Sequence, residues 1–144
     1  MKYNCEIVID ADIKKVVKLF EDPNNMAKWQ PGFISMDVLE GKAGEAGSRS
    51  KLLYQMGKRE IEMIETITEN DLPTSFSATY EAKNVWNEVK NHFEKLPNGK
   101  TKHWTENEFK MSGMMKFMAW LMPGVFKKQS YKYLELFKAF VEKH

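Results

Sequence analysis

The first 20 residues show two patterns of apolar positions, one typical of a strand and one typical of a helix. Residues 2–9 alternate between apolar and polar positions, which predicts a half-buried strand. In residues 13–20 the apolar positions recur three and four apart, which predicts an amphipathic helix with Asp10 as its N-cap. A second short helix is expected over 22–29, where the Pro-Gly pair that follows ends it. The N-terminal part is therefore expected to be one strand and two short helices.

Between residues 33 and 111 the period changes to two, and turn residues divide this stretch into six further strands. The expected ranges are 33–40, 49–56, 59–68, 75–82, 85–96 and 100–111. The Asn98–Gly99 pair joins the last two and is a strong hairpin signal. The longer connection at 41–48 contains three glycines and is expected to be a plain loop, with a mobile lid as the alternative.

The C-terminal residues predict a long helix that is interrupted early. Pro123 has no amide hydrogen to donate and clashes with the preceding turn, so a helix breaks there. After the break, Phe126, Tyr133, Phe137 and Phe140 form one apolar stripe, which is the expected packing face. Residues 114–122 are apolar on nearly all sides, which is more than a packing face requires. We interpret this segment as the wall or gate of a cavity, able to move independently of the helix behind it.

Together these elements predict one α+β domain over residues 1–144. Short connections favour an antiparallel meander of about seven strands, and a single long helix has to cover its apolar face. A chain of this length is expected to bury roughly two-thirds of the surface that it exposes when unfolded.

Strand parity predicts which side chains face that helix, because a half-buried sheet keeps its charges outside. The inner face so derived is unusually polar, and unpartnered buried polar groups cost about 1–3 kcal/mol each. Either water and a ligand satisfy these groups, or a bulge in 100–111 exchanges Trp104 and His103. The polar inner positions are Tyr54, Glu65, Asn87, Asn91, Thr101, His103, Thr105 and Asn107; the apolar ones include Met56, Met63, Phe93, Phe109 and Met111.

Composition narrows the function classes. The formal net charge is +2 and is not gathered in a basic stripe, which argues against a nucleic-acid partner. A lone Cys5 excludes an internal disulfide framework, and no Cys/His set has the spacing of a zinc site. The apolar window at 114–126 spans about 13 residues and contains Lys116, which is short of a membrane span and predicts no stable insertion. No signal peptide is apparent, so we expect a cytoplasmic protein, monomeric or weakly dimeric, without cofactor or metal.

Several local motifs recur along the chain in a recognisable order: Ile7–Ala11, Val16, Val17, Phe20, Asp22–Pro23, Trp29–Pro31, Gly44, Gly47, Asn98–Thr101 and Leu136–Glu142. These motifs and the order of elements resemble the START-like (SRPBCC) superfamily, in particular its polyketide cyclase/dehydrase and lipid-transport branch. The resemblance covers nearly the whole chain and carries no catalytic signature. It implies a helix-grip fold, in which a curved antiparallel sheet grips the long C-terminal helix around a hydrophobic cavity. Ala11–Asp12 departs from the usual Ala-Pro of the family, which removes one helix-start signal.

Three functions fit this pattern. The first is binding of a hydrophobic or amphipathic small molecule, such as a lipid, a polyketide-like or an aromatic compound, in the cavity between sheet and helix. The second is a cofactor-free cyclase, dehydratase or hydrolase in which Glu65 and His103 act as acid and base beside Tyr54. The third is a protein- or membrane-docking module that uses residues 114–122. Besides the inner-face positions, the expected ligand contacts are Trp29, Met114, Phe117, Met118, Leu121 and Met122.

Overall fold

The structure is a computed structural model that describes all residues, 1–144. It contains seven strands, one 3₁₀ turn and four helices, close to the predicted ranges. The strands are β1 (Lys2–Ile9), β2 (Phe33–Glu40), β3 (Arg49–Met56), β4 (Arg59–Asp71), β5 (Ser75–Ala82), β6 (Val85–Lys95) and β7 (Thr101–Met111). The helical elements are α1 (Ile13–Glu21), η1 (Pro23–Asn25), α2 (Met26–Trp29), α3 (Gly113–Leu121) and α4 (Gly124–Lys143).

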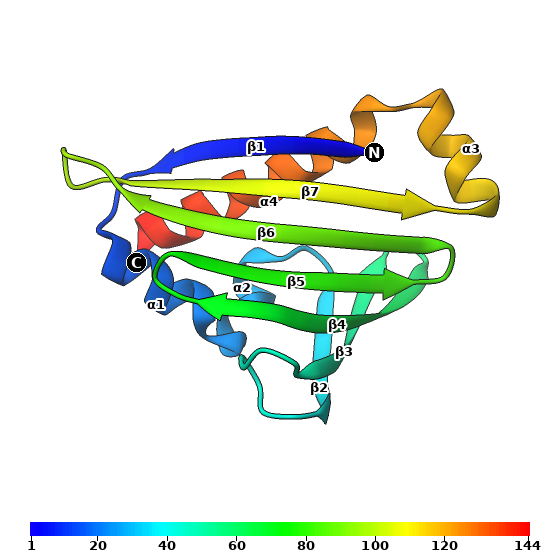
Figure 1. Cartoon of the computed structure of the whole chain (residues 1–144), viewed down its shortest axis with the longest axis horizontal. Helices are drawn as coiled ribbons and strands as arrows, with labels where there is room; N and C mark the ends of the chain where they lie inside the picture. The colour runs from blue at the N-terminus through cyan, green and yellow to red at the C-terminus, as the bar shows by residue number, and fades with distance from the viewer.

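All seven strands form one antiparallel sheet in the order β1-β7-β6-β5-β4-β3-β2. The sheet is strongly curved, so that β2 and β3 run across the direction of the other strands in Figure 1. Helix α4 lies behind the sheet and makes its closest backbone approach to β1. This arrangement confirms the expected α+β helix-grip fold with two short helices after the first strand.

The hydrophobic core occupies one end of the concave side. It joins Ile9 of β1 and Val16 of α1 to Phe93 of β6 and to Phe137 and Val141 in the second half of α4. The helical stripe expected from sequence supplies its centre, since Phe137 has no exposed surface. Phe137 meets the rings of Phe20, Trp29 and His103 with centroids 5.0–5.8 Å away. Stability is therefore concentrated where α1, α2 and the end of α4 meet the sheet.

The first helix begins two residues later than expected. Asp12, not Asp10, is its N-cap, and the Asp12 carboxylate accepts a hydrogen bond from the amide of Lys14 at 2.8 Å. The prediction was wrong because Asp10 and Asp12 are both good N-cap residues and only the fold decides between them. Asp12 thus replaces the missing proline as the signal that starts α1.

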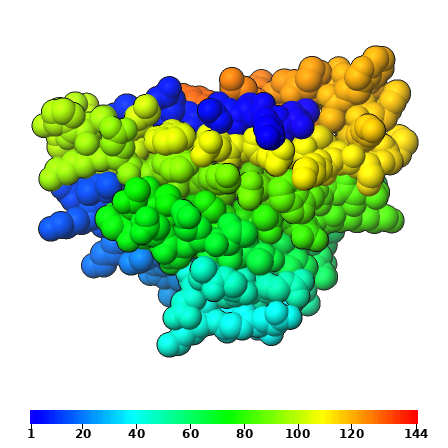
Figure 2. Space-filling model, in the orientation of Figure 1, coloured from blue at the N-terminus to red at the C-terminus, as the bar shows by residue number.

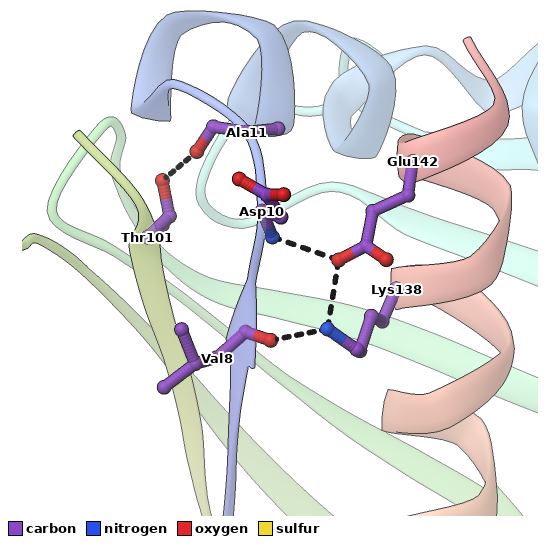
Figure 3. Close-up of polar contacts among 6 residues, drawn as sticks. All are labelled: Val8, Asp10, Ala11, Thr101, Lys138 and Glu142. Atoms are coloured by element: carbon purple, nitrogen blue, oxygen red, sulfur yellow. Dashed lines mark hydrogen bonds and ion pairs between the residues drawn. The ribbon is translucent and has the colours of Figure 1, made fainter. Parts of the chain in front are cut away.

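The backbone of Asp10 has a different partner, on α4. Its amide donates to Oε2 of Glu142 at 2.7 Å, and the same oxygen lies 2.7 Å from Nζ of Lys138 (Figure 3). Lys138 Nζ also donates to the carbonyl of Val8 at 2.6 Å, and the hydroxyl of Thr101 donates to the carbonyl of Ala11 at 2.8 Å (Figure 3). The contacts of Glu142 and Lys138 attach the end of α4 to the end of the edge strand β1.

Replacing Glu142 with alanine is expected to lower the free energy of unfolding by about 1 kcal/mol, because the Asp10 amide and the Lys138 ammonium lose their acceptor. Lys138, then the Asp10 amide, hold the pKa of Glu142 below its usual range. A lowered folded-state pKa contributes stability above the unfolded-state value, about 4.3, and this contribution is lost as the pH falls through the folded-state pKa. Denaturant unfolding at pH 7 and pH 3 measures both effects.

Glu135→Ala is the matched control, since Glu135 is exposed on the same helix and makes no side-chain hydrogen bond or ion pair. An equal loss of stability in the two variants at pH 7 would show that the contacts of Glu142 do not attach α4 to β1.

The loop at 41–48 is tied to its neighbours. The amide of Gly47 donates to the carbonyl of Ile67 at 2.7 Å, and the Asn70 side chain donates to the carbonyl of Gly44 at 2.6 Å. Arg49 and Glu40 form an ion pair of 3.1 Å across the base of the loop. These contacts favour the plain loop over the mobile lid.

Candidate functional site

The concave face of the sheet carries the polar positions that strand parity predicts. His103 pairs with Phe93 on β6 and with Ile7 on β1, and directly opposite residues of an antiparallel pair share a face. His103 is buried while Trp104 is on the convex side, stacked on His92 at 3.9 Å between ring centroids. The alternation in 101–111 is therefore regular, and the bulge that would exchange Trp104 and His103 is absent.

His103 lies in the packed end of this face. Its ring stacks on Phe93 with centroids 4.5 Å apart, and Nε2 donates to Oδ1 of Asn91 at 2.9 Å. Burial, and then the nearby His92, lower the pKa of His103 to about 3. The imidazole is therefore neutral at pH 7, and its Nδ1 is buried without a hydrogen-bond partner. A neutral side chain in an aromatic core is poorly suited to exchange protons with a ligand near neutral pH.

A second polar group lies farther along the face, on β3, β4 and β5. Tyr80 lies directly opposite Glu65, and burial raises the pKa of the Glu65 carboxyl above its usual range. Burial, followed by the charges of Tyr133 and Glu65, raises the pKa of Tyr54 beyond the ordinary range of a phenol. The hydroxyl of Tyr54 donates to the side-chain oxygen of Gln30. A carboxyl and two phenols thus share the concave face and influence one another's pKa.

Tyr80 was missed by the sequence prediction. Its strand was recognised, but parity was not applied to residues 75–82, where Phe76, Ala78 and Tyr80 share one face. The cross-strand pairs Glu65–Tyr80 and Tyr80–Asn87 place Tyr80 beside two residues that had been predicted to line the site. The same alternation that identified Glu65 would have found it.

The structure does not bring Glu65 and His103 together. Cross-strand pairing connects Glu65 to Tyr80, Tyr80 to Asn87, and Asn87 to Phe109. The position on β7 level with Glu65 is therefore Phe109, six residues from His103. Measured along the sheet, three strand spacings of about 4.8 Å and six residues of about 3.3 Å separate the two positions, roughly 14 Å by 20 Å. A hydrogen bond or one bridging water spans far less. Their concerted use as acid and base is therefore contradicted, whereas Glu65 and Tyr54 do lie in one cluster.

The middle of the concave face lies away from the closest helix contacts. Helix α4 makes its closest backbone approach to β1 and α1 approaches β6, whereas the backbones of β3, β4 and β5 contact mainly the neighbouring strands. Side chains that point into this region, among them Met63, Glu65, Tyr80, Asn87 and Val89, are only half-buried. Ser48 Oγ and His103 Nδ1 are the only fully buried side-chain polar atoms without a partner. The remaining polar atoms of the face are either paired or reachable by a water-sized molecule.

The expected apolar contacts from residues 114–122 lie elsewhere. Helix α3 projects from one end of the molecule (Figure 1), and most of its large side chains are exposed. Met56 is on the inner face by parity but is also exposed, because β3 ends there beyond any covering element. The expectation of a wall closed over the sheet is therefore not met in this structure. The exposed members of the predicted site are Met56, Met114, Phe117, Met118, Leu121 and Met122.

The other predicted positions lie on or beside the concave face. Trp29 is half-buried and packs on α4, 5.0 Å from Phe137 and 6.5 Å from Tyr133 between ring centroids. Phe109 is half-buried against Phe126 at the start of α4, 5.0 Å away. Thr105 and Asn107 are buried and hydrogen-bonded to each other at 2.9 Å. Two of the polar side chains predicted on the inner face are therefore partners of each other. Asn91, Phe93 and Thr101 are buried, and Asn87 and Met111 are half-buried.

A separate surface groove of about 530 Å³ lies between the edge strand β1 and the start of α4. Its lining is largely polar and includes Lys127 and Lys128. The edge of β1 and the first turns of α4 therefore border an open groove that is distinct from the concave face.

Comparisons with known proteins agree with this geometry. The profile of the family described as polyketide cyclase / dehydrase and lipid transport matches residues 2–133. Among solved structures, the ZhuI aromatase/cyclase of a Streptomyces species superposes with a TM-score of 0.81 at 12% identity, over 99% of this chain and 94% of that one. A conserved protein of Geobacillus kaustophilus gives a TM-score of 0.81 at 15% identity, over 99% and 96% of the two chains.

A norcoclaurine synthase point mutant from Thalictrum flavum, in complex with a transition-state analogue, gives a TM-score of 0.74 at 11% identity. The match covers 100% of this chain and 95% of that one. At such identities the likeness concerns the fold alone. No curated protein matches the chain.

Proposed function

Because the chain belongs to the polyketide cyclase / dehydrase and lipid-transport family, we propose that it binds an amphipathic small molecule between the concave face of the sheet and α4. The apolar part of the ligand lies over Met63, Val89 and Phe109. Its polar end meets Glu65 and Tyr80, whose carboxyl and phenol can donate and accept hydrogen bonds.

The observation that carries this proposal is that Glu65 and Tyr80, directly opposite each other on β4 and β5, stay half-buried in a part of the concave face away from the closest helix contacts. In a close-packed interior a carboxyl at this place would need a full set of partners, since an unpaired polar group costs about 1–3 kcal/mol. When no ligand is bound, water that enters this space can supply the hydrogen bonds that the carboxyl requires. An incoming hydroxyl or amine can displace the water and keep its hydrogen bonds.

The proposal assigns binding, and not acid–base catalysis by Glu65 and His103, to this face. The raised pKa of Glu65 keeps more of its carboxyl protonated than usual, so it can donate to a carbonyl or ether oxygen as well as accept from a hydroxyl. This range of partners suits a ligand with oxygen-rich groups at one end.

Replacing Val89 with tryptophan is expected to abolish binding and leave the fold intact. Val89 is half-buried on the inner face between Ala78 and Asn107, so an indole there fills the proposed space. The affinity for the fluorescent probe 1-anilinonaphthalene-8-sulfonate should fall at least about tenfold, as expected from losing one large apolar contact area. Lys90→Trp, which adds the same side chain on the exposed convex side, should bind the probe like the unmodified protein.

Two results would contradict the proposal. One is a loss of about 1–3 kcal/mol of stability in Val89→Trp, the cost of overpacking a region that is already filled. The other is an absence of probe binding in the unmodified protein at about 100 µM, far above the low-micromolar affinity of a formed apolar site. A Phe117→Ser/Trp120→Ser variant should keep its probe affinity, which separates the concave face from the exposed helix α3.

A further inference from the structure

Helix α3 exposes an apolar surface that nothing in the protein covers. Trp120 is 76% exposed and Met114 is 72% exposed, while Ala119 is the only buried residue of the helix. The helix stands out from the end of the molecule, where it forms the orange projection in Figure 2. Large exposed apolar patches mark interaction sites in soluble proteins. The exposed large side chains of this segment are Met114, Phe117, Met118, Trp120, Leu121, Met122 and Val125.

The charges in the segment of chain that contains α3 all have one sign. Residues 109–134 contain no Asp or Glu and carry Lys110, Lys116, Lys127, Lys128 and Lys132. None of these five ammonium groups forms an ion pair, because all the salt bridges of the protein lie elsewhere. Lys110 lies over the ring of Trp86 at 4.7 Å, which leaves its positive charge uncompensated. The apolar helix is thus accompanied, within residues 109–134, by five lysines that form no ion pair.

From this combination we infer that α3 docks the protein on the surface of an anionic lipid bilayer. A helix in the interface buries its apolar side chains at the level of the acyl chains, and nearby lysines contact the headgroups. Trp120 suits this place because indole partitions to the boundary between headgroups and acyl chains. No helix of the protein is long and apolar enough to cross a membrane, so the docking is peripheral.

The distribution of charge favours a bilayer over a second copy of the chain. In a symmetric dimer through α3, the lysines of each copy would approach those of the other, and like charges at close range oppose association. An anionic bilayer presents the complementary charge over the whole area that the segment covers. The same electrostatics distinguish an anionic from a zwitterionic surface.

Both ends of α3 are built to present it at an angle to the sheet. Gly113 has a φ of +59°, a left-handed conformation that favours glycine. The amide of Ser112 donates to the carbonyl of Asn84 at 3.0 Å, which fixes the start of α3 to the β5–β6 turn. At its other end, Met122 and Pro123 separate α3 from α4. Docking would turn the end of the sheet that carries the β5–β6 turn toward the bilayer.

Vesicle flotation tests the inference without reference to any small-molecule ligand. The unmodified protein should float with vesicles of 70% phosphatidylcholine and 30% phosphatidylserine at low salt, and binding should weaken at 0.5 M NaCl as screening shortens the Debye length to a few ångströms. Phe117→Ser/Trp120→Ser should weaken binding at least about tenfold. Lys127→Gln/Lys128→Gln should weaken it by about fivefold for each lysine. Leu39→Ser, at an exposed apolar position on β2, is the control and should bind normally.

The inference is overturned if the unmodified protein does not float with these vesicles at low salt, or if Phe117→Ser/Trp120→Ser floats as well as the unmodified protein. It is also overturned if the unmodified protein is a stable dimer that this variant dissociates, since α3 is then covered by a second copy. The result is independent of probe binding at Val89, so either proposal can fail while the other stands.

Discussion

Phe137→Ala is expected to lower the free energy of unfolding by about 4 kcal/mol, the typical cost of removing a fully buried phenyl ring. Phe137 has no exposed surface and is surrounded by Phe20, Trp29 and His103. These neighbours come from α1, α2 and β7, so a cavity here separates three elements at once. Chemical denaturation at pH 7 measures the loss, and Phe137→Leu, which keeps most of the volume, should cost less.

The matched control is Phe117→Ala, which makes the same chemical change on α3. Phe117 is 53% exposed, so the variant should stay within about 0.5 kcal/mol of the unmodified protein. A loss of about 3 kcal/mol or more at Phe117 would mean that α3 folds down over the concave face in solution. The pair of variants therefore tests both the packed end of the protein and the exposure of α3.

The order of the elements was predictable because local rules agree along most of the chain. Charged residues alternate with apolar ones in the strands, and a shift of one residue would bury those charges, so parity determined the facing of β6 and β7 correctly. Pro123 likewise separated α3 from α4, because its missing amide acts within one helical turn. Strand parity and the helix break at Pro123 were therefore confirmed, whereas the N-cap predicted at Asp10 was wrong.

The errors concern relations between elements. Parity places Glu65 and His103 on one face but carries no information about their separation across β5 and β6, which only the register supplies. The apolar character of α3 indicated a buried wall, yet the direction of the helix depends on the turns at Gly113 and Met122. Asp10 and Asp12 are equivalent as caps until the end of α4 occupies the amide of Asp10.

The two ends of the concave face differ in how they satisfy polar groups. At the packed end, Asn91 and His103 pair with each other among aromatic rings. At the other end, Glu65 and Tyr80 lie opposite each other and remain half-buried. The first arrangement holds a neutral histidine in place, whereas the second holds a carboxyl whose pKa is raised by burial. Protonation of His103 should therefore destabilise the folded protein, whereas protonation of Glu65 should stabilise it.

Acidification from pH 7 to pH 4.5 is expected to lose about 2.5 kcal/mol of stability through His103 alone. Its folded-state pKa of about 3 lies below the unfolded value of about 6.5, so between these limits the unfolded chain binds one more proton. Stability then falls by about 1.4 kcal/mol for each pH unit as the pH decreases through this window. Denaturant unfolding at half-unit pH intervals measures the slope.

His103→Gln should flatten this slope, because glutamine keeps an amide donor for Asn91 and has no proton to bind. Glu65→Gln should have the opposite effect. The folded-state pKa of Glu65 is raised, so the folded protein binds the proton first, and the stability contributed by that proton is present at low pH and lost as the pH rises. Without this contribution from Glu65, the free energy of unfolding should fall more steeply as the pH decreases. An unchanged slope in His103→Gln would mean that the imidazole is accessible to solvent, against its burial in the core.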